Sequence, residues 1–145
     1  MSDAAAAIPI RGLDHVVLRV ADVERSIAFY GEVLGCAVER RIAELGLVQL
    51  RAGSALIDLV PVDSPLGRAG GGAVAEKGRN VDHFALELDT FDDRAIRAHL
   101  SAHDVEAGDT GRRYGAGGFG PSLYLSDPDG NVVELKGPPD GDDDG

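Results

Sequence analysis

Apolar and polar residues alternate in two-residue steps over residues 13–20 and again over residues 81–88. This pattern is typical of a half-buried β-strand, with one face on a core and the other turned away from it. Each segment carries a histidine at the equivalent place, His15 and His83, 68 residues apart. The recurrence predicts that the chain is built from an internal repeat.

A helix signal follows each of these strands at the same offset. Asp22 is the predicted N-cap of a helix over residues 23–34, and Thr90 that of a helix over residues 91–102. Both helices place apolar residues at spacings of three and four, so each should lay one stripe on the core.

Three shorter strands are predicted after each helix, over residues 37–44, 47–51 and 55–60, and over residues 105–107, 122–126 and 131–136. Each half therefore has the order β-α-β-β-β, which indicates an α+β fold made of two βαβββ modules within a single domain. We expect the modules to cover about residues 12–62 and 80–137, joined by a flexible, glycine-rich linker over residues 63–79.

The two ends of the chain and one internal segment do not fit the repeat. Residues 1–11 are interpreted as a disordered N-terminal arm, and residues 138–145, which hold four aspartates, as a disordered acidic tail. Residues 111–120 are interpreted as a glycine-rich loop that flanks a pocket, with Tyr114 as a substrate-binding residue.

Four polar side chains stand out on strand faces that point away from the predicted helices. They are His15 and Asp58 in the first module, and His83 and Glu134 in the second. Burying such carboxylates on largely apolar faces is costly without a cation. Two imidazoles with carboxylates suit a divalent metal such as zinc, nickel, cobalt, manganese or iron. If the modules pack about a pseudo-twofold axis, the pattern predicts that these four residues converge on one metal ion, either within one chain or across a dimer.

Two further residues are candidates for contact with a substrate. Arg19 lies on the same strand face as His15, where it either binds an anionic substrate group or pairs with Glu87. Tyr124, ten residues before Glu134, is either a proton donor or a core aromatic residue.

Composition narrows the choice of partners. The chain has 145 residues and a formal net charge of −11, which disfavours nucleic acid and anionic membrane surfaces. No apolar run reaches the roughly 20 residues of a membrane span. The single cysteine, Cys36, excludes an intrachain disulfide and favours the cytoplasm. Open sheet edges favour a homodimer.

Four stretches resemble a known superfamily: Leu13-Asp14-His15-Val16, Ser26-Ile27-Ala28-Phe29-Tyr30 with Val33-Leu34-Gly35, Asp82-His83-Phe84-Ala85, and Tyr124-Leu125-Ser126-Asp127-Pro128-Asp129-Gly130-Asn131 running into Glu134-Leu135. They resemble the vicinal oxygen chelate superfamily, which includes glyoxalase I, bleomycin-resistance proteins and extradiol dioxygenases, and the chain looks like a glyoxalase I-like member. The resemblance implies a cupped, open barrel around a metal ion. It also implies that His15, His83 and Glu134 are ligands and that Asp58 stands where glyoxalase I has a glutamate ligand.

Three functions follow from this resemblance. The first is a divalent-metal-dependent lyase or isomerase of glyoxalase type, in which adjacent oxygens of a small substrate are chelated and Glu134 is the general base. The second is an iron-dependent ring-cleaving dioxygenase, in which Asp58 does not bind the metal. The third is a non-enzymatic protein that sequesters a small molecule or antibiotic.

Overall fold

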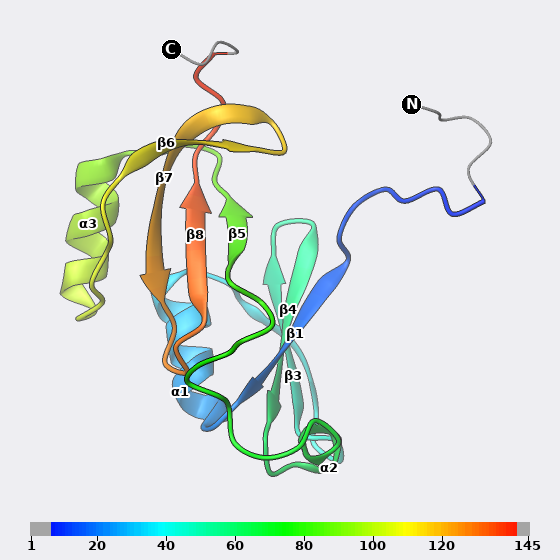
Figure 1. The fold of residues 1–145 in the computed structure, drawn as a ribbon. Helices are drawn as coiled ribbons and strands as arrows, with labels where there is room; N and C mark the ends of the chain where they lie inside the picture. The colour runs from blue at the N-terminus through cyan, green and yellow to red at the C-terminus, as the bar shows by residue number, and fades with distance from the viewer. Residues whose placement is uncertain (1–6, 142–145) are drawn as a thin grey trace.

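A computed structural model describes residues 7–141, which form two four-stranded β-sheets (Figure 1). The first sheet consists, in spatial order, of β1 (His15–Val20), β4 (Ala55–Pro61), β3 (Leu47–Ala52) and β2 (Val38–Ile42). The second consists of β5 (Phe84–Glu87), β8 (Val132–Lys136), β7 (Gly118–Ser126) and β6 (Gly111–Gly115). In both sheets the first strand of the module pairs in parallel with the last, and the other pairs are antiparallel. This topology confirms the two βαβββ modules, with open sheets rather than a closed barrel.

The helix of the first module has an unexpected second half. Asp22 is its N-cap, as predicted, because the Asp22 carboxylate accepts a hydrogen bond from the Arg25 N–H at 3.1 Å. After α1 (Val23–Ile27), however, the chain continues as a π-helix, η1 (Ala28–Val33). Two adjacent residues of this segment, Phe29 and Tyr30, are buried.

The helix of the second module begins later than predicted. Helix α3 (Asp93–Ala102) has Asp92 as its N-cap, whose side chain accepts from the Ala95 N–H at 3.1 Å. Thr90 was therefore the wrong cap. Phe91, which the prediction placed in the first turn, lies before the helix and packs against the core. A carboxylate is a strong acceptor for the free N–H groups of a first turn, which explains why the helix starts at this aspartate.

Two predictions for the second module were wrong at the level of elements. Residues 105–107 form no strand, although Val105 and Ala107 still pack against the core. The predicted glycine-rich loop over residues 111–120 is instead a β-hairpin, in which β6 pairs with the first half of β7. The glycines suggested a loop, but all of them except Gly117 belong to paired strands, and Gly118 supplies the positive φ of +116° after the turn.

One hydrophobic core joins the two modules. It combines buried residues from both sheets with residues of η1 and α3, among them Val20, Tyr30, Leu50, Ile57, Leu59, Leu100, Leu123 and Val133. A buried hydrogen bond crosses between the modules, from the Tyr30 hydroxyl to the Asp127 carboxylate at 2.6 Å. His99 Nε2 also contacts the carbonyl oxygen of Val33 at 2.7 Å. The modules are thus docked through the sheet faces that carry the helices.

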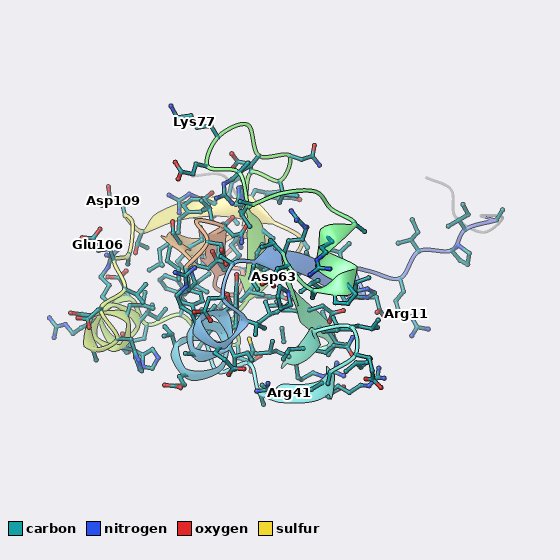
Figure 2. All side chains as sticks on the ribbon, turned by 90° about the horizontal axis from the view of Figure 1, so that it is seen from below. Arg11, Arg41, Asp63, Lys77, Glu106 and Asp109 are labelled. Carbon is teal, nitrogen blue, oxygen red and sulfur yellow. The ribbon has the colours of Figure 1, made fainter. Side chains whose placement is uncertain are left out.

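The segments outside the modules are partly ordered. A short helix, α2 (Pro65–Arg68), lies within the predicted linker, and the loop that follows projects from the body with Lys77 near its tip (Figure 2). Residues 7–11 are exposed, and the segment leads away from the first sheet (Figure 1). Residues 138–141 of the predicted acidic tail lie alongside β7, and the Asp140 N–H donates to the Phe119 carbonyl at 2.9 Å. Residues 1–6 and 142–145 lie outside the described part of the chain.

None of the helices within residues 7–141 is both long and apolar enough to cross a membrane.

Candidate functional site

We call the face of each sheet that is turned away from the shared core its open face. On the first sheet it carries His15, Gln49 and Asp58, because His15 lies opposite Leu56, two residues before Asp58, and Gln49 lies opposite Asp58. The Asp58 side chain is buried, with 4% of its surface exposed. The predicted first-module pair therefore occupies one face of two adjacent strands.

Gln49 holds the Asp58 carboxylate in place. Its Nε2 donates to both carboxylate oxygens, at 3.2 and 3.1 Å. This amide satisfies part of the buried charge without neutralising it, so each oxygen keeps lone pairs for a further donor or a cation. Sequence analysis missed Gln49, although its position in the alternation of β3 places it on this face.

The second sheet carries the equivalent pair. Glu134, in β8, is 7% exposed, and its Oε1 lies 3.2 Å from His83 Nε2, just before β5 begins. Tyr124 lies opposite Glu134 on β7, and its ring meets the His83 ring edge-to-face with centroids 5.1 Å apart. Each module thus places one histidine and one buried carboxylate on its open face.

Both histidines are held by the aspartate that precedes them. His15 Nδ1 lies 2.8 Å from an Asp14 oxygen, and His83 Nδ1 lies 2.7 Å from an Asp82 oxygen. When Nδ1 donates to this carboxylate, Nε2 keeps its lone pair and can bind a metal. Histidine ligands of metals usually donate their other N–H to such an acceptor. The residues therefore fit a metal site in chemistry and in orientation.

The same contact affects the protonation of His15. The hydrogen bond to Asp14 raises the pKa of His15 above its ordinary value of 6.5, and the charge of Asp58 adds to this effect. His15 therefore keeps its proton to a higher pH than a free histidine does. We expect Asp14→Asn to lower the pKa of His15 towards 6.5, measured by NMR titration of metal-free protein.

Asp82→Asn is the matched control, because it changes the equivalent aspartate and leaves the surroundings of His15 intact. The explanation is wrong if Asp14→Asn leaves the His15 titration unchanged, or if both variants shift it equally.

The two pairs do not meet within one chain. No three His, Cys, Asp or Glu side chains of residues 7–141 lie close enough together to hold a metal ion. The reason is topological: the sheets are docked through their helix-bearing faces, so each open face turns away from the common core. One chain thus presents two half-sites. The sequence left open whether the four residues meet within one chain or between two chains, and within one chain they do not meet.

Two of the predicted substrate-binding residues lie apart from these pairs. Arg19 donates from Nε to the carbonyl of Gly67 at 3.1 Å, and from Nη2 to the carbonyls of Gly71 and Gly72 at 2.8 and 2.7 Å. It therefore ties the linker to β1 and forms no ion pair with Glu87. Tyr114 is 72% exposed and packs on Phe119, on the side of the hairpin away from Tyr124.

Two basic residues that the sequence analysis did not assign to the site share the open face of the second sheet. The Arg113 guanidinium lies over the Tyr124 ring at 4.6 Å, and Lys136 follows Glu134 by two positions on β8. The alternation along β8 already placed Lys136 on this face, but the interpretation of residues 111–120 as a loop concealed the orientation of Arg113.

Comparison with solved structures gives the same fold. An integron cassette protein from the mobile metagenome of V. cholerae is 30% identical, with a TM-score of 0.67 over 88% of this chain and 95% of that one. A virulence protein from Salmonella typhimurium is 25% identical, with a TM-score of 0.67 over 89% and 98% of the two chains. A lactoylglutathione lyase from Agrobacterium tumefaciens is 20% identical, with a TM-score of 0.66 over 89% and 95%, a similarity that shows the fold alone.

No curated protein is similar enough to the chain to count as a match. The sequence model of the Glyoxalase/Bleomycin resistance protein/Dioxygenase superfamily matches residues 12–135, which include both modules and both histidine–carboxylate pairs. The chain therefore belongs to the glyoxalase/bleomycin resistance protein/dioxygenase superfamily, as the resemblance of its motifs to the vicinal oxygen chelate proteins implied.

Proposed function

We propose that the protein is a divalent-metal-dependent lyase or isomerase of glyoxalase type that acts on a small substrate with vicinal oxygens. One observation carries this proposal: the same arrangement occurs in both modules, with a histidine tied to the preceding aspartate and a buried carboxylate on the same open face. A structural histidine needs no such partner, and its recurrence with the carboxylate fits paired halves of one metal site.

His15, Asp58, His83 and Glu134 are the residues that would hold the ion, with zinc, nickel, cobalt, manganese and iron all compatible with nitrogen and oxygen ligands. When bound, the metal supplies Lewis-acid polarisation of adjacent substrate oxygens. Glu134 is suited to move a proton, because it is buried beside His83 and out of bulk water. Tyr124, whose ring contacts the His83 ring, is the proposed proton donor to the same substrate.

A second candidate function rests on Gln49. Because its amide donates to both Asp58 oxygens, Asp58 already has a partner without any metal. If that contact persists in the loaded protein, the ligands are His15, His83 and Glu134, which is the triad of a non-haem iron oxygenase. An iron-dependent ring-cleaving dioxygenase is therefore the alternative that this contact favours.

We propose further that the complete site forms between two copies of the chain. The histidines on the open faces are flanked by unusually exposed apolar side chains: Leu13 is 92% exposed, Val17 49% and Val81 58%. A second copy would cover these residues while bringing the first-sheet half-site of one chain to the second-sheet half-site of the other. The homodimer would then contain two equivalent sites.

Mixing two inactive variants tests both proposals. We expect wild-type protein to bind about one zinc ion per chain, and His15→Ala and His83→Ala each to lose it, measured by elemental analysis after gel filtration. If the two variants are unfolded and refolded together, random pairing should restore about one quarter of the wild-type zinc content, because half the dimers are mixed and each mixed dimer has one intact site.

Each result has its own meaning. Wild-type protein that binds none of the five metals overturns the metal-dependent function. Wild-type protein that binds metal, with variants that lose it and a mixture that recovers none, overturns the shared site alone. Each variant refolded alone is the control for recovery that does not depend on mixing.

A further inference from the structure

The open face of the second sheet carries two cations without a carboxylate partner among residues 7–141. Arg113 donates from Nη1 to the Ser122 carbonyl at 2.7 Å and to the Ser122 hydroxyl at 2.9 Å. Its Nε and Nη2 groups make no hydrogen bond with the described residues. The Nε and Nη2 edge of the guanidinium therefore has no hydrogen-bond partner among these residues. The Arg113 Cζ atom lies 4.6 Å from the centre of the Tyr124 ring.

Lys136 reaches β7 from the other side, and its ammonium group lies at Gly118, whereas Arg113 contacts Ser122. It is 7% exposed, and its Nζ donates to the carbonyls of Gly118 and Gly137 at 3.1 and 3.4 Å. Its register neighbours are Ser122 on β7 and Glu87 on β5. Glu87 forms no ion pair with it in the described part of the chain. An ammonium group is thus buried with backbone carbonyls as its only acceptors there.

This arrangement is unusual for so acidic a chain. With 25 acidic against 14 basic residues, carboxylates are abundant, and other arginines do pair with them, as Arg51 does with Glu39 and Arg97 with Asp93. Arg112, adjacent to Arg113 but on the opposite face of the hairpin, pairs with Asp140. Burying a cation such as Lys136 without a counter-ion is costly, and the half-buried Arg113 on the same open face also has no carboxylate partner among the described residues. Together they indicate that an anion from outside the chain binds this face.

We propose that Arg113 and Lys136 form an oxyanion subsite that binds a carboxylate, phosphate or phosphonate group of the substrate. Arg113 presents the free guanidinium edge that such groups accept in pairs of hydrogen bonds, and Lys136 adds a buried positive charge. The Tyr124 ring contacts both the Arg113 guanidinium and the His83 ring, so an anion bound to Arg113 lies next to the second half-site. The inference rests on the proposed function in one respect: it makes the substrate of that site a small organic anion.

The subsite can be tested without the metal. Inorganic phosphate and acetate are titrated separately into chelator-treated full-length protein at low ionic strength. We expect calorimetry to detect binding of at least one of the two anions. Arg113→Gln and Lys136→Met should each weaken that binding by about tenfold or more, since each removes a charge-assisted contact. Whichever anion binds more tightly identifies the substrate group as carboxylate or phosphoryl.

Arg112→Gln is the matched control, because it removes the same charge from the neighbouring residue on the other face, and circular dichroism checks that each variant is folded. The subsite is overturned if neither anion binds, or if Arg112→Gln weakens anion binding as much as Arg113→Gln does. If Lys136→Met is misfolded, Arg113→Gln alone decides. If the protein binds the anion but no metal, the subsite is supported and the proposed function is overturned. If it binds metal but no anion, the proposed function is supported and the subsite is overturned.

Discussion

Replacing Glu134 with glutamine is expected to lower metal-dependent turnover by about 1,000-fold or more and to lower the bound metal by at least about tenfold. The carboxylate is both a proposed ligand and the proposed general base. The amide keeps an oxygen of similar shape near His83, but it loses the negative charge that attracts a cation and the basicity that accepts a proton. Turnover is measured on a substrate found by screening the metal-loaded protein, and metal by elemental analysis.

Glu87→Gln is the control for this variant, because Glu87 lies on the same sheet face but is exposed and makes no contact with His83. It should retain full metal content. If Glu134→Gln binds metal as the wild type does and turns over at the same rate, Glu134 is neither ligand nor base. Loss of turnover with full metal content would assign it the proton-transfer role alone.

Asp127→Ala is expected to destabilise the protein by about 4 kcal/mol, which corresponds to a fall in Tm of about 13 °C for a domain of this size. The buried carboxylate accepts four hydrogen bonds: one from the Tyr30 hydroxyl at 2.6 Å, two from the N–H groups of Asp129 and Asn131, and one from Asn131 Nδ2. Its loss unties the hairpin turn and leaves the fully buried Tyr30 hydroxyl without a partner.

Tyr30→Phe should have a smaller effect, about 1.5 kcal/mol, because Asp127 then keeps three of its four donors. Burial and the neighbouring Asp127 charge raise the pKa of Tyr30, so this hydroxyl stays a donor at ordinary pH. Tyr114→Phe, which removes an exposed hydroxyl, is the matched control and should change Tm little. Thermal unfolding followed by circular dichroism measures all three; an Asp127→Ala protein as stable as Tyr114→Phe would show that this turn does not hold the modules together.

The strands were predictable where one face is buried and the other is not. Alternation located β1 and β3 to within two residues, because a half-buried strand must repeat with period two. Glycine defeated the same reasoning in β6. Gly111, Gly115 and Gly118 lack side chains to alternate, and they make room for Arg113 and Lys136, whose atoms lie where a Cβ at Gly111 or Gly115 would point.

Short-range features were less predictable when several residues competed for one role. Thr90 and Asp92 are both acceptable N-caps. The helix begins at Asp92, whose carboxylate is a strong acceptor, and Phe91 packs against the core just before it. The π-helix of η1 was likewise outside the prediction, which continued a regular helix through Phe29 and Tyr30. Such choices depend on neighbours that are distant in the sequence.

The sequence by itself determined the repeat, the superfamily and the membership of each histidine–carboxylate pair, because strand alternation assigns a residue to a face without reference to the rest of the fold. Only the tertiary structure decided how the faces are combined. The shared core of η1, α3 and both sheets docks the modules through their helix-bearing faces, and this leaves the two half-sites apart within one chain. The structure also decided that Arg19 is occupied by linker carbonyls whereas Arg113 has a free edge, because the acceptors that surround an arginine come from segments that folding alone brings together.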